Sequence, residues 1–172
     1  LEILSRILDV QNPKLTVVFC NTKKMVDDLT AGLQSRGYFA DGLHGDLKQI
    51  QRDGVMNKFR NSTIDILVAT DVAARGIDVE DVDLVINYDM PQDVEYYVHR
   101  IGRTARAGRE GTAISFVSPR EMNTLSQIQK YTKTKIEKRD MPTLKDLIKR
   151  HEERFMEDIK EEINKNEHTK EL

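Results

Sequence analysis

The chain has 172 residues, of which 38% are hydrophobic and 33% are charged. It is long enough for one α/β domain with a core and a short appendage, and too short for two such domains. A formal net charge of −2 does not indicate a nucleic-acid partner, so any such partner must be held by a local group of charges. The single cysteine, Cys20, excludes an intramolecular disulfide and a multi-cysteine zinc site, and its apolar neighbours indicate a buried thiol rather than a reactive one.

No apolar stretch approaches the ~20 residues that a membrane span needs, and no signal peptide opens the chain. We therefore expect a soluble cytoplasmic protein. Because the first residue is Leu1 rather than Met, we also expect the chain to be a piece of a longer polypeptide.

Short apolar runs alternate with longer helical patterns, which is typical of a mainly parallel sheet built from βαβ units. The expected strands are residues 15–20, 38–43, 64–69, 83–88 and 112–117. Several of them carry consecutive apolar or β-branched residues, as strands buried on both faces do. The expected helices are residues 23–36, 47–60, 94–103 and a further one from 119 to 130, which Pro119 opens.

The composition changes after Pro142. Apolar residues keep a helical spacing at Leu144, Ile148, Phe155, Ile159 and Ile163, which predicts an amphipathic helix. We place the main domain at residues 1–142 and a helical extension at 143–172. Two interpretations of the apolar row stay open: it packs on the main domain, or it begins a further helical or dimerisation module.

The most basic segment, residues 99–109, reads His-Arg-Ile-Gly-Arg-Thr-Ala-Arg-Ala-Gly-Arg. Arg100, Arg103 and Arg106 are three apart, so on a helix they would lie along one side, within reach of a common anion. Arginine suits phosphate because its planar fork donates two parallel hydrogen bonds and stays charged. The alternative is a solvated basic turn or a generic phosphate patch.

A second segment, residues 69–78, follows the expected strand 64–69 directly and reads Ala-Thr-Asp-Val-Ala-Ala-Arg-Gly-Ile-Asp. Thr70 and Asp71 would put a hydroxyl and free backbone N–H groups at the start of a short helix, where phosphate binds well. Asp71 could equally be only an N-cap. Gly76 would end this helix and bring Asp78 round in a loop.

Two further segments follow strands. In residues 44–52, Gly45 permits a tight turn and Asp46 can cap the next helix, on which Gln49 and Arg52 would share an exposed face. Residues 18–23 end in Asn-Thr-Lys, polar residues that can cap the helix that follows.

These four segments, in this order, resemble motifs IV, IVa, V and VI of the DEAD-box helicases. The resemblance covers residues 1–142 and is strongest to bacterial members, including the cold-shock-type helicases. It implies a RecA-like three-layer α/β/α domain, the C-terminal half of an ATP-dependent RNA helicase, which closes on an N-terminal RecA-like domain of the same polypeptide and drives local unwinding of RNA duplexes.

The resemblance also implies residue roles. Arg103 and Arg106 would be arginine fingers on the γ-phosphate of ATP, and Asp78 would contact its ribose. Coupling to the other domain would involve His99, Arg100 and Arg75. The RNA sugar–phosphate backbone would be bound, without regard to base sequence, by Thr22, Gly45, Gln49, Arg52, Thr70 and Asp71. Mg²⁺ would be held by the N-terminal domain, and no metal by this chain.

The 172 residues contain neither a Gly-x-x-x-x-Gly-Lys-Ser/Thr loop nor an Asp-Glu-Ala-Asp string. We therefore expect the chain alone neither to hydrolyse ATP nor to unwind RNA, since arginine fingers act only in an assembled site. Ala105 departs from the glycine that is common in the family, which puts a close backbone approach there in question, although alanine favours a helix. Because Arg103 and Arg106 both remain, we expect little functional loss. Two other functions remain open, a stand-alone RNA-binding or scaffold module and half of a DNA helicase or translocase.

Overall fold

The computed structural model describes residues 1–75, 82–105 and 110–168. The chain divides into two compact units, one formed by Pro13–Glu137 and the other by Leu1–Asn12 together with Lys138–Leu172. The first unit contains the sheet and all the motif segments, whereas the second contains the first and the last helix.

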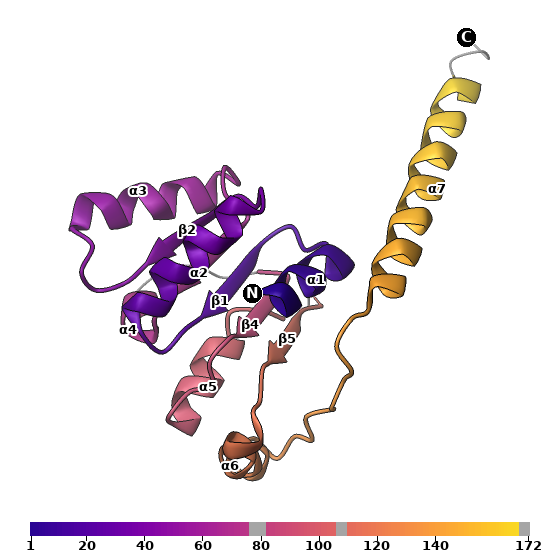
Figure 1. Cartoon of the computed structure of the whole chain (residues 1–172). Helices are drawn as coiled ribbons and strands as arrows, with labels where there is room; N and C mark the ends of the chain where they lie inside the picture. Colours follow the sequence, from indigo (N-terminus) through magenta and orange to yellow (C-terminus); the bar gives the residue numbers. More distant parts are fainter. Residues whose placement is uncertain (76–81, 106–109, 169–172) are drawn as a thin grey trace. The chain divides into compact units, whose positions relative to one another are not determined.

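Across the described residues of the larger unit, five parallel strands form one sheet in the order β2-β3-β1-β4-β5 (Figure 1). The strands are β1 Thr16–Phe19, β2 Ala40–Leu43, β3 Ile66–Ala69, β4 Leu84–Asn87 and β5 Thr112–Ser115. Each of the five predicted ranges contains one of them, and each strand is shorter than its range. The prediction of a mainly parallel sheet is confirmed.

The three central strands, β3, β1 and β4, have every residue buried, which explains their unbroken apolar runs. Successive side chains point to opposite faces. On one face Phe19 and Leu67 pack in a core with Phe59 of α3 (Gln49–Arg60). On the opposite face Val18 and Val68 are fully buried as well, so both faces are covered, as the α/β/α prediction requires.

The remaining helices of this unit are α2 Lys23–Ser35, α4 Asp71–Ala74, α5 Val94–Ile101 and α6 Met122–Thr132, the last preceded by a 3-10 turn at Pro119–Glu121. The connection from β1 to β2 crosses the sheet in the opposite direction to the connection from β2 to β3. Because such connections are right-handed, α2 and α3 lie on opposite faces. All four predicted helices are present, but their ends differ: the one expected at 47–60 begins at Gln49, and the one expected at 94–103 ends at Ile101. The one expected from residue 119 begins as the 3-10 turn and continues as α6.

The smaller unit contains α1 (Glu2–Gln11) and α7 (Leu144–His168). Arg154 of α7 donates a 2.6 Å hydrogen bond to the carbonyl oxygen of Asp9, and α7 begins at a cap in which the Asp146 carboxylate accepts from the backbone and hydroxyl of Thr143. We did not predict α1, although Leu4, Ile7 and Leu8, all buried, follow a helical spacing. No helix of the described residues is long and apolar enough to cross a membrane.

Within this unit the apolar row of α7 is exposed: Leu144 63%, Ile148 58%, Phe155 65%, Ile159 38% and Ile163 52%. The partly buried residues of α7 lie elsewhere around the helix, at Leu147, Arg150 and Arg154. At 100° per residue these three centre on a direction well away from the apolar row. The contacts of α7 with α1 therefore leave the row uncovered.

Candidate functional site

The segments that follow β1, β2, β3 and β4 lie at one edge of the sheet, the one formed by the carboxyl ends of the strands. Phe19 is in register with both Ala69 and Asn87, and Leu43 with Ala69, so the four strands end level. All the strands are parallel, so this edge collects the residues that follow them, and such an edge is where open α/β sheets bind ligands. Thr22, Gly45 and Thr70 each lie one to three residues beyond it.

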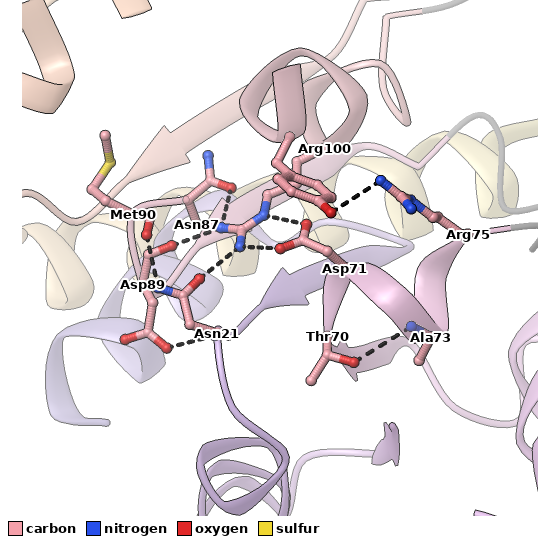
Figure 2. A network of polar contacts seen from close by, with 10 residues as sticks. Asn21, Thr70, Asp71, Ala73, Arg75, Asn87, Asp89, Met90 and Arg100 are labelled. Atoms are coloured by element: carbon pink, nitrogen blue, oxygen red, sulfur yellow. Dashed lines mark hydrogen bonds and ion pairs between the residues drawn. The ribbon is translucent and has the colours of Figure 1, made fainter. Parts of the chain in front are cut away.

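Arg100 lies at the centre of this edge, with a side chain that is only 1% exposed. Its Nε and Nη2 each donate a 2.7 Å hydrogen bond to a different carboxylate oxygen of Asp71, which makes the ion pair bidentate (Figure 2). Its other hydrogen bonds go to Asn21 Oδ1 at 2.8 Å, Asn87 Oδ1 at 3.3 Å and the carbonyl oxygen of Asp89 at 2.7 Å. Since a guanidinium group has five N–H donors, Arg100 uses all of them inside the domain.

The positions of both partners in their helices favour this pair. Asp71 is the first residue of α4, where the helix dipole favours negative charge, and Arg100 lies in the last turn of α5, where it favours positive charge. The Arg100 guanidinium also lies 5.2 Å from the centre of the Phe19 ring. The negative group that we expected near the clustered arginines is, for Arg100, the Asp71 carboxylate.

Two details of the prediction are wrong here. Arg100 and Arg103 do not lie along one helix, because α5 ends at Ile101 and the N–H of Arg103 bonds to the carbonyl of Arg100 in a tight turn. Asp71 is not the N-cap of α4, since the Thr70 hydroxyl accepts the N–H of Ala73 at 3.4 Å. Arg106 and Asp78 lie outside the described residues.

A half-open hollow of about 70 Å³ adjoins the Arg100 network and is lined by Phe19, Asp71, Ala74, Arg75, Tyr96, His99, Arg100 and Arg103. Arg103 Nη2 donates to the carbonyl oxygen of Ala74 at 3.3 Å. Arg75 Nη2 donates to the Tyr96 hydroxyl at 3.0 Å, with its guanidinium 5.0 Å from the centre of that ring. The hollow thus brings together Arg75 and Arg103 beside Arg100, whose own donors are all used. The guanidinium groups of Arg75 and Arg103 are donors of the kind that suits a phosphate group.

Cys20 lies beside this network and is fully buried. Burial, assisted by the negative charge of Asp89 and opposed by the charge of Arg100, raises the pKa of its thiol to about 12. The thiol is therefore protonated at neutral pH and packs as a small apolar group, which confirms the interpretation as a buried thiol.

Thr22 lies between β1 and α2 and caps α2, because its hydroxyl accepts the N–H of Met25 at 3.2 Å. Gly45 is exposed, and among the described atoms none lies within 4 Å of where a Cβ on it would be. Its φ is also not positive. The fold therefore does not itself require glycine at position 45, and the open space suits a closely approaching ligand.

Asp46 does not cap α3, contrary to our prediction. The helix begins at Gln49 with Lys48 as its N-cap residue, and the Asp46 carboxylate instead accepts a hydrogen bond from Lys23 Nζ. Gln49 is exposed and bonds to Asp53, whereas Arg52 is partly buried and donates to the carbonyl oxygen of Ala73 at 3.3 Å. We predicted that both side chains lie on an exposed face of α3; Gln49 is exposed, but Arg52 is only partly so.

Three residues of this edge were not singled out from the sequence, namely Asn87, Asp89 and Tyr96, and Asn21 was noted only as a possible cap of the next helix. Asn87 is fully buried and binds Ser115 Oγ at 3.0 Å as well as Arg100. A signal existed, because Asn87 ends an otherwise apolar strand and an isolated polar residue at a strand end needs a partner. Within the described ranges, no group of three or more His, Cys, Asp or Glu could hold a metal ion.

Comparison with known proteins agrees with this geometry. The family described as "Helicase conserved C-terminal domain" matches residues 1–108. The chain is 56% identical over 142 residues to the ATP-dependent RNA helicase CshA of Listeria monocytogenes, which covers 83% of this chain and 27% of that protein. It spans about a third of the length of the curated relatives that it matches.

Two solved structures are similar in fold and sequence. The E. coli DEAD-box protein SrmB, bound to regulator of ribonuclease activity A, has a TM-score of 0.74 and 36% identity, covering 85% of this chain and 84% of that one. S. cerevisiae Dbp5, bound to RNA and ADP BeF3, has a TM-score of 0.70 and 41% identity, covering 76% of this chain and 35% of that one.

Proposed function

The chain belongs to the helicase C-terminal domains and is the C-terminal domain of a DEAD-box RNA helicase, and from this we propose how it acts. It closes on an N-terminal RecA-like domain of the same polypeptide, binds the RNA backbone and supplies arginine fingers for ATP hydrolysis, which drives local unwinding. The observation that carries the proposal is the hollow in which Arg103, His99 and Arg75 converge beside the Arg100–Asp71 pair. We divide the parent protein at residue 142, with 143–172 as an extension.

ATP would be held mainly by the other domain, together with Mg²⁺, and would bring a γ-phosphate to this hollow. Arg103 fits the role of finger because its guanidinium lies at the hollow on a turn and not within a helix. Arg106 and Asp78 would complete the contacts, to the γ-phosphate and the ribose. Arginine stabilises the charge that develops during phosphoryl transfer and needs no change of protonation to do so.

RNA would lie across the carboxyl edge of β2, β3 and β1. The hydroxyls of Thr22 and Thr70 cap helices there, Asp71 follows Thr70, and Gly45 leaves open space. Gln49 and Arg52 add an amide and a guanidinium from α3. Contacts of this kind reach phosphate and sugar and do not read bases, so the domain would bind RNA without sequence preference. We also propose that the parent protein acts in the cytoplasm.

Arg100 would couple the RNA contacts to the ATP contacts from within the domain. Its guanidinium holds Asp71, next to the RNA-side Thr70, while its backbone lies between His99 and the turn that carries Arg103. A displacement of Thr70–Asp71 on RNA binding would therefore pass to the finger through a rigid bidentate pair. In this scheme Arg100 is a positioning residue, and His99 and Arg75 are the coupling side chains at the hollow.

The test is ATP turnover with single-stranded RNA, for this chain alone and for the chain joined to its N-terminal domain. We expect turnover only in the joined protein, and its loss on Arg103→Ala with ATP binding retained. Arg60→Ala, an exposed arginine at the end of α3, is the control. Turnover that survives Arg103→Ala would refute the finger assignment, and turnover by the chain alone would show a complete site within it.

Two alternatives are separated by the same assay. A passive RNA-binding or scaffold module would bind RNA with no turnover even in the joined protein, and a DNA translocase would be stimulated by DNA as strongly as by RNA. We also propose that the exposed apolar row of α7 mediates a homodimer. A monomeric mass in sedimentation across micromolar concentrations would contradict this for the present chain.

A further inference from the structure

We propose that Asp46 is an internal competitor of RNA. In the free domain its carboxylate holds the ammonium group of Lys23, and a backbone phosphate replaces that carboxylate when RNA binds. The inference rests on the proposed RNA contacts of Thr22 and Gly45, since Lys23 directly follows the first and Asp46 the second. It adds a cation to the RNA site and a residue that weakens RNA binding.

The ion pair joins segments that are far apart in the sequence. Lys23 is the first residue of α2, Asp46 lies in the turn between β2 and α3, and Lys23 Nζ is 2.5 Å from Asp46 Oδ2. In the sheet β3 lies between β1 and β2, which places the ends of β1 and β2 roughly 10 Å apart. The pair therefore passes beside the segment that leaves β3, where Thr70 caps α4, and lies among the proposed RNA contacts Thr22, Gly45 and Thr70.

Both charges are present at neutral pH. The hydrogen bond and the charge of Asp46 raise the pKa of Lys23, and the charge of Asp27 adds to them. The hydrogen bond from Lys23 is the largest influence on the pKa of Asp46 and lowers it, assisted by the charge of Lys23. Lys23 is thus a full cation facing two carboxylates, Asp46 and Asp27.

The contact is easily exchanged. The side chains of Lys23 and Asp46 are 62% and 60% exposed, and water screens such a pair so that it contributes little to stability. A backbone phosphate presents its own charge and several acceptor oxygens to the same ammonium group. Exchanging the carboxylate for phosphate leaves the lysine paired throughout and requires only the movement of a flexible, exposed side chain.

The turn itself stays in place when the pair opens, because His44 fixes it independently. His44 is 7% exposed, and its Nε2 lies 2.9 Å from Asp27 Oδ1 on α2. Its Nδ1 accepts the backbone N–H of Asp46 at 3.4 Å. The His44–Asp27 bond therefore holds the backbone of the turn against α2, while the Asp46 side chain is free to release Lys23.

The experiment compares the 172-residue chain with its Asp46→Asn variant, binding a fluorescent single-stranded ten-nucleotide RNA by anisotropy at several salt concentrations. We expect Asp46→Asn to bind RNA tighter, by roughly 3- to 10-fold at low salt. We also expect a steeper slope of log K against log salt for Asp46→Asn, because salt screens the ion pair that competes with RNA in the wild-type chain. Lys23→Met in the Asp46→Asn background should abolish both the tighter binding and the steeper slope.

Asp28→Asn is the matched control. Asp28 pairs with Lys24 at 2.9 Å on α2, so this change also removes one carboxylate charge and frees a lysine that directly follows Lys23. It should tighten binding less and leave the slope unchanged. Binding by Asp46→Asn that is no tighter than that of Asp28→Asn would overturn the proposal.

Gly45→Ala separates this failure from a failure of the proposed RNA site. If Gly45→Ala weakens RNA binding but Asp46→Asn does not tighten it, the RNA site stands and only the competitor role of Asp46 is refuted. If Gly45→Ala leaves RNA binding unchanged, the proposed contact at this edge is itself wrong, and the competitor role falls with it.

Discussion

Replacing Arg100 by lysine tests whether the guanidinium network holds the edge of the sheet together. Lysine keeps the positive charge but has three N–H donors in place of five and cannot grip both oxygens of Asp71. At least two of the five hydrogen bonds are lost, in a site where Arg100 is 1% exposed. Each bond to a charged group contributes about 1.5–3 kcal/mol, so the free energy of unfolding should fall by about 3 kcal/mol or more.

Urea unfolding followed by circular dichroism measures this loss. With an m-value of roughly 2 kcal/mol/M for a domain of this size, the midpoint should fall by about 1.5 M. Arg103→Lys is the control, because Arg103 is only partly buried and its hydrogen bond to the carbonyl oxygen of Ala74 is long, at 3.3 Å. This change should cost less stability than Arg100→Lys. Equal losses for the two variants would refute the claim that the number and direction of the Arg100 donors matter.

Further predictions concern two glycines and the partly buried carboxylate of Asp65. Gly111→Ala should destabilise the domain by about 2 kcal/mol or more and reduce turnover in the parent protein. The new Cβ would lie 2.0 Å from Thr104 Oγ1 and 2.5 Å from the backbone nitrogen of Ala105, and would therefore displace the turn that carries Arg103. Thermal unfolding measures the loss of stability, and steady-state kinetics measures the loss of turnover. Gly54→Ala, where no described atom lies within 4 Å, should instead stabilise α3 by about 0.5–1 kcal/mol. Burial raises the pKa of Asp65 above its ordinary 3.8, so its folded form holds a proton more tightly than its unfolded form and stability falls as pH rises above about that value. Asp65→Asn should therefore raise the Tm at pH 7 more than at pH 4, and an equal gain at both would contradict this.

The strands could be predicted from the sequence because burial on both faces leaves an unbroken apolar run, as in Ile66–Ala69. The order of the strands could not, since β1 lies between β3 and β4 and no local pattern encodes a neighbour. At α4 the sequence left Asp71 as one possible N-cap, and the N-cap is Thr70. Thr70 and Asp71 are both good N-caps, and the choice depends on Arg100, 29 positions away in the chain.

The prediction that the arginines lie along one helix was wrong because the sequence pattern does not show where the helix ends. A spacing of three predicts one helix face only while the helix continues, and α5 ends at Ile101. Arg100 is then buried among polar partners while Arg103 lies at the hollow. Ala105 repeats the lesson: its φ of 56° is left-handed, so its helix preference is irrelevant there, and the family's frequent glycine would fit this backbone with less strain. That strain is tolerable at a single position, since the left-handed region costs roughly 1–2 kcal/mol per residue.

A buried ion pair is a costly way to hold two helices together, since apolar side chains of similar volume often stabilise a fold as well or better. What Arg100 and Asp71 add is direction: two parallel hydrogen bonds fix the start of α4 against the end of α5 at one distance and one angle. The residues fixed in this way are Thr70 on one side and the turn with Arg103 on the other. A pair that costs stability but sets this geometry is expected where RNA binding must be transmitted to ATP hydrolysis, and an apolar replacement such as Arg100→Met with Asp71→Leu should fold yet lose RNA-stimulated turnover in the parent protein.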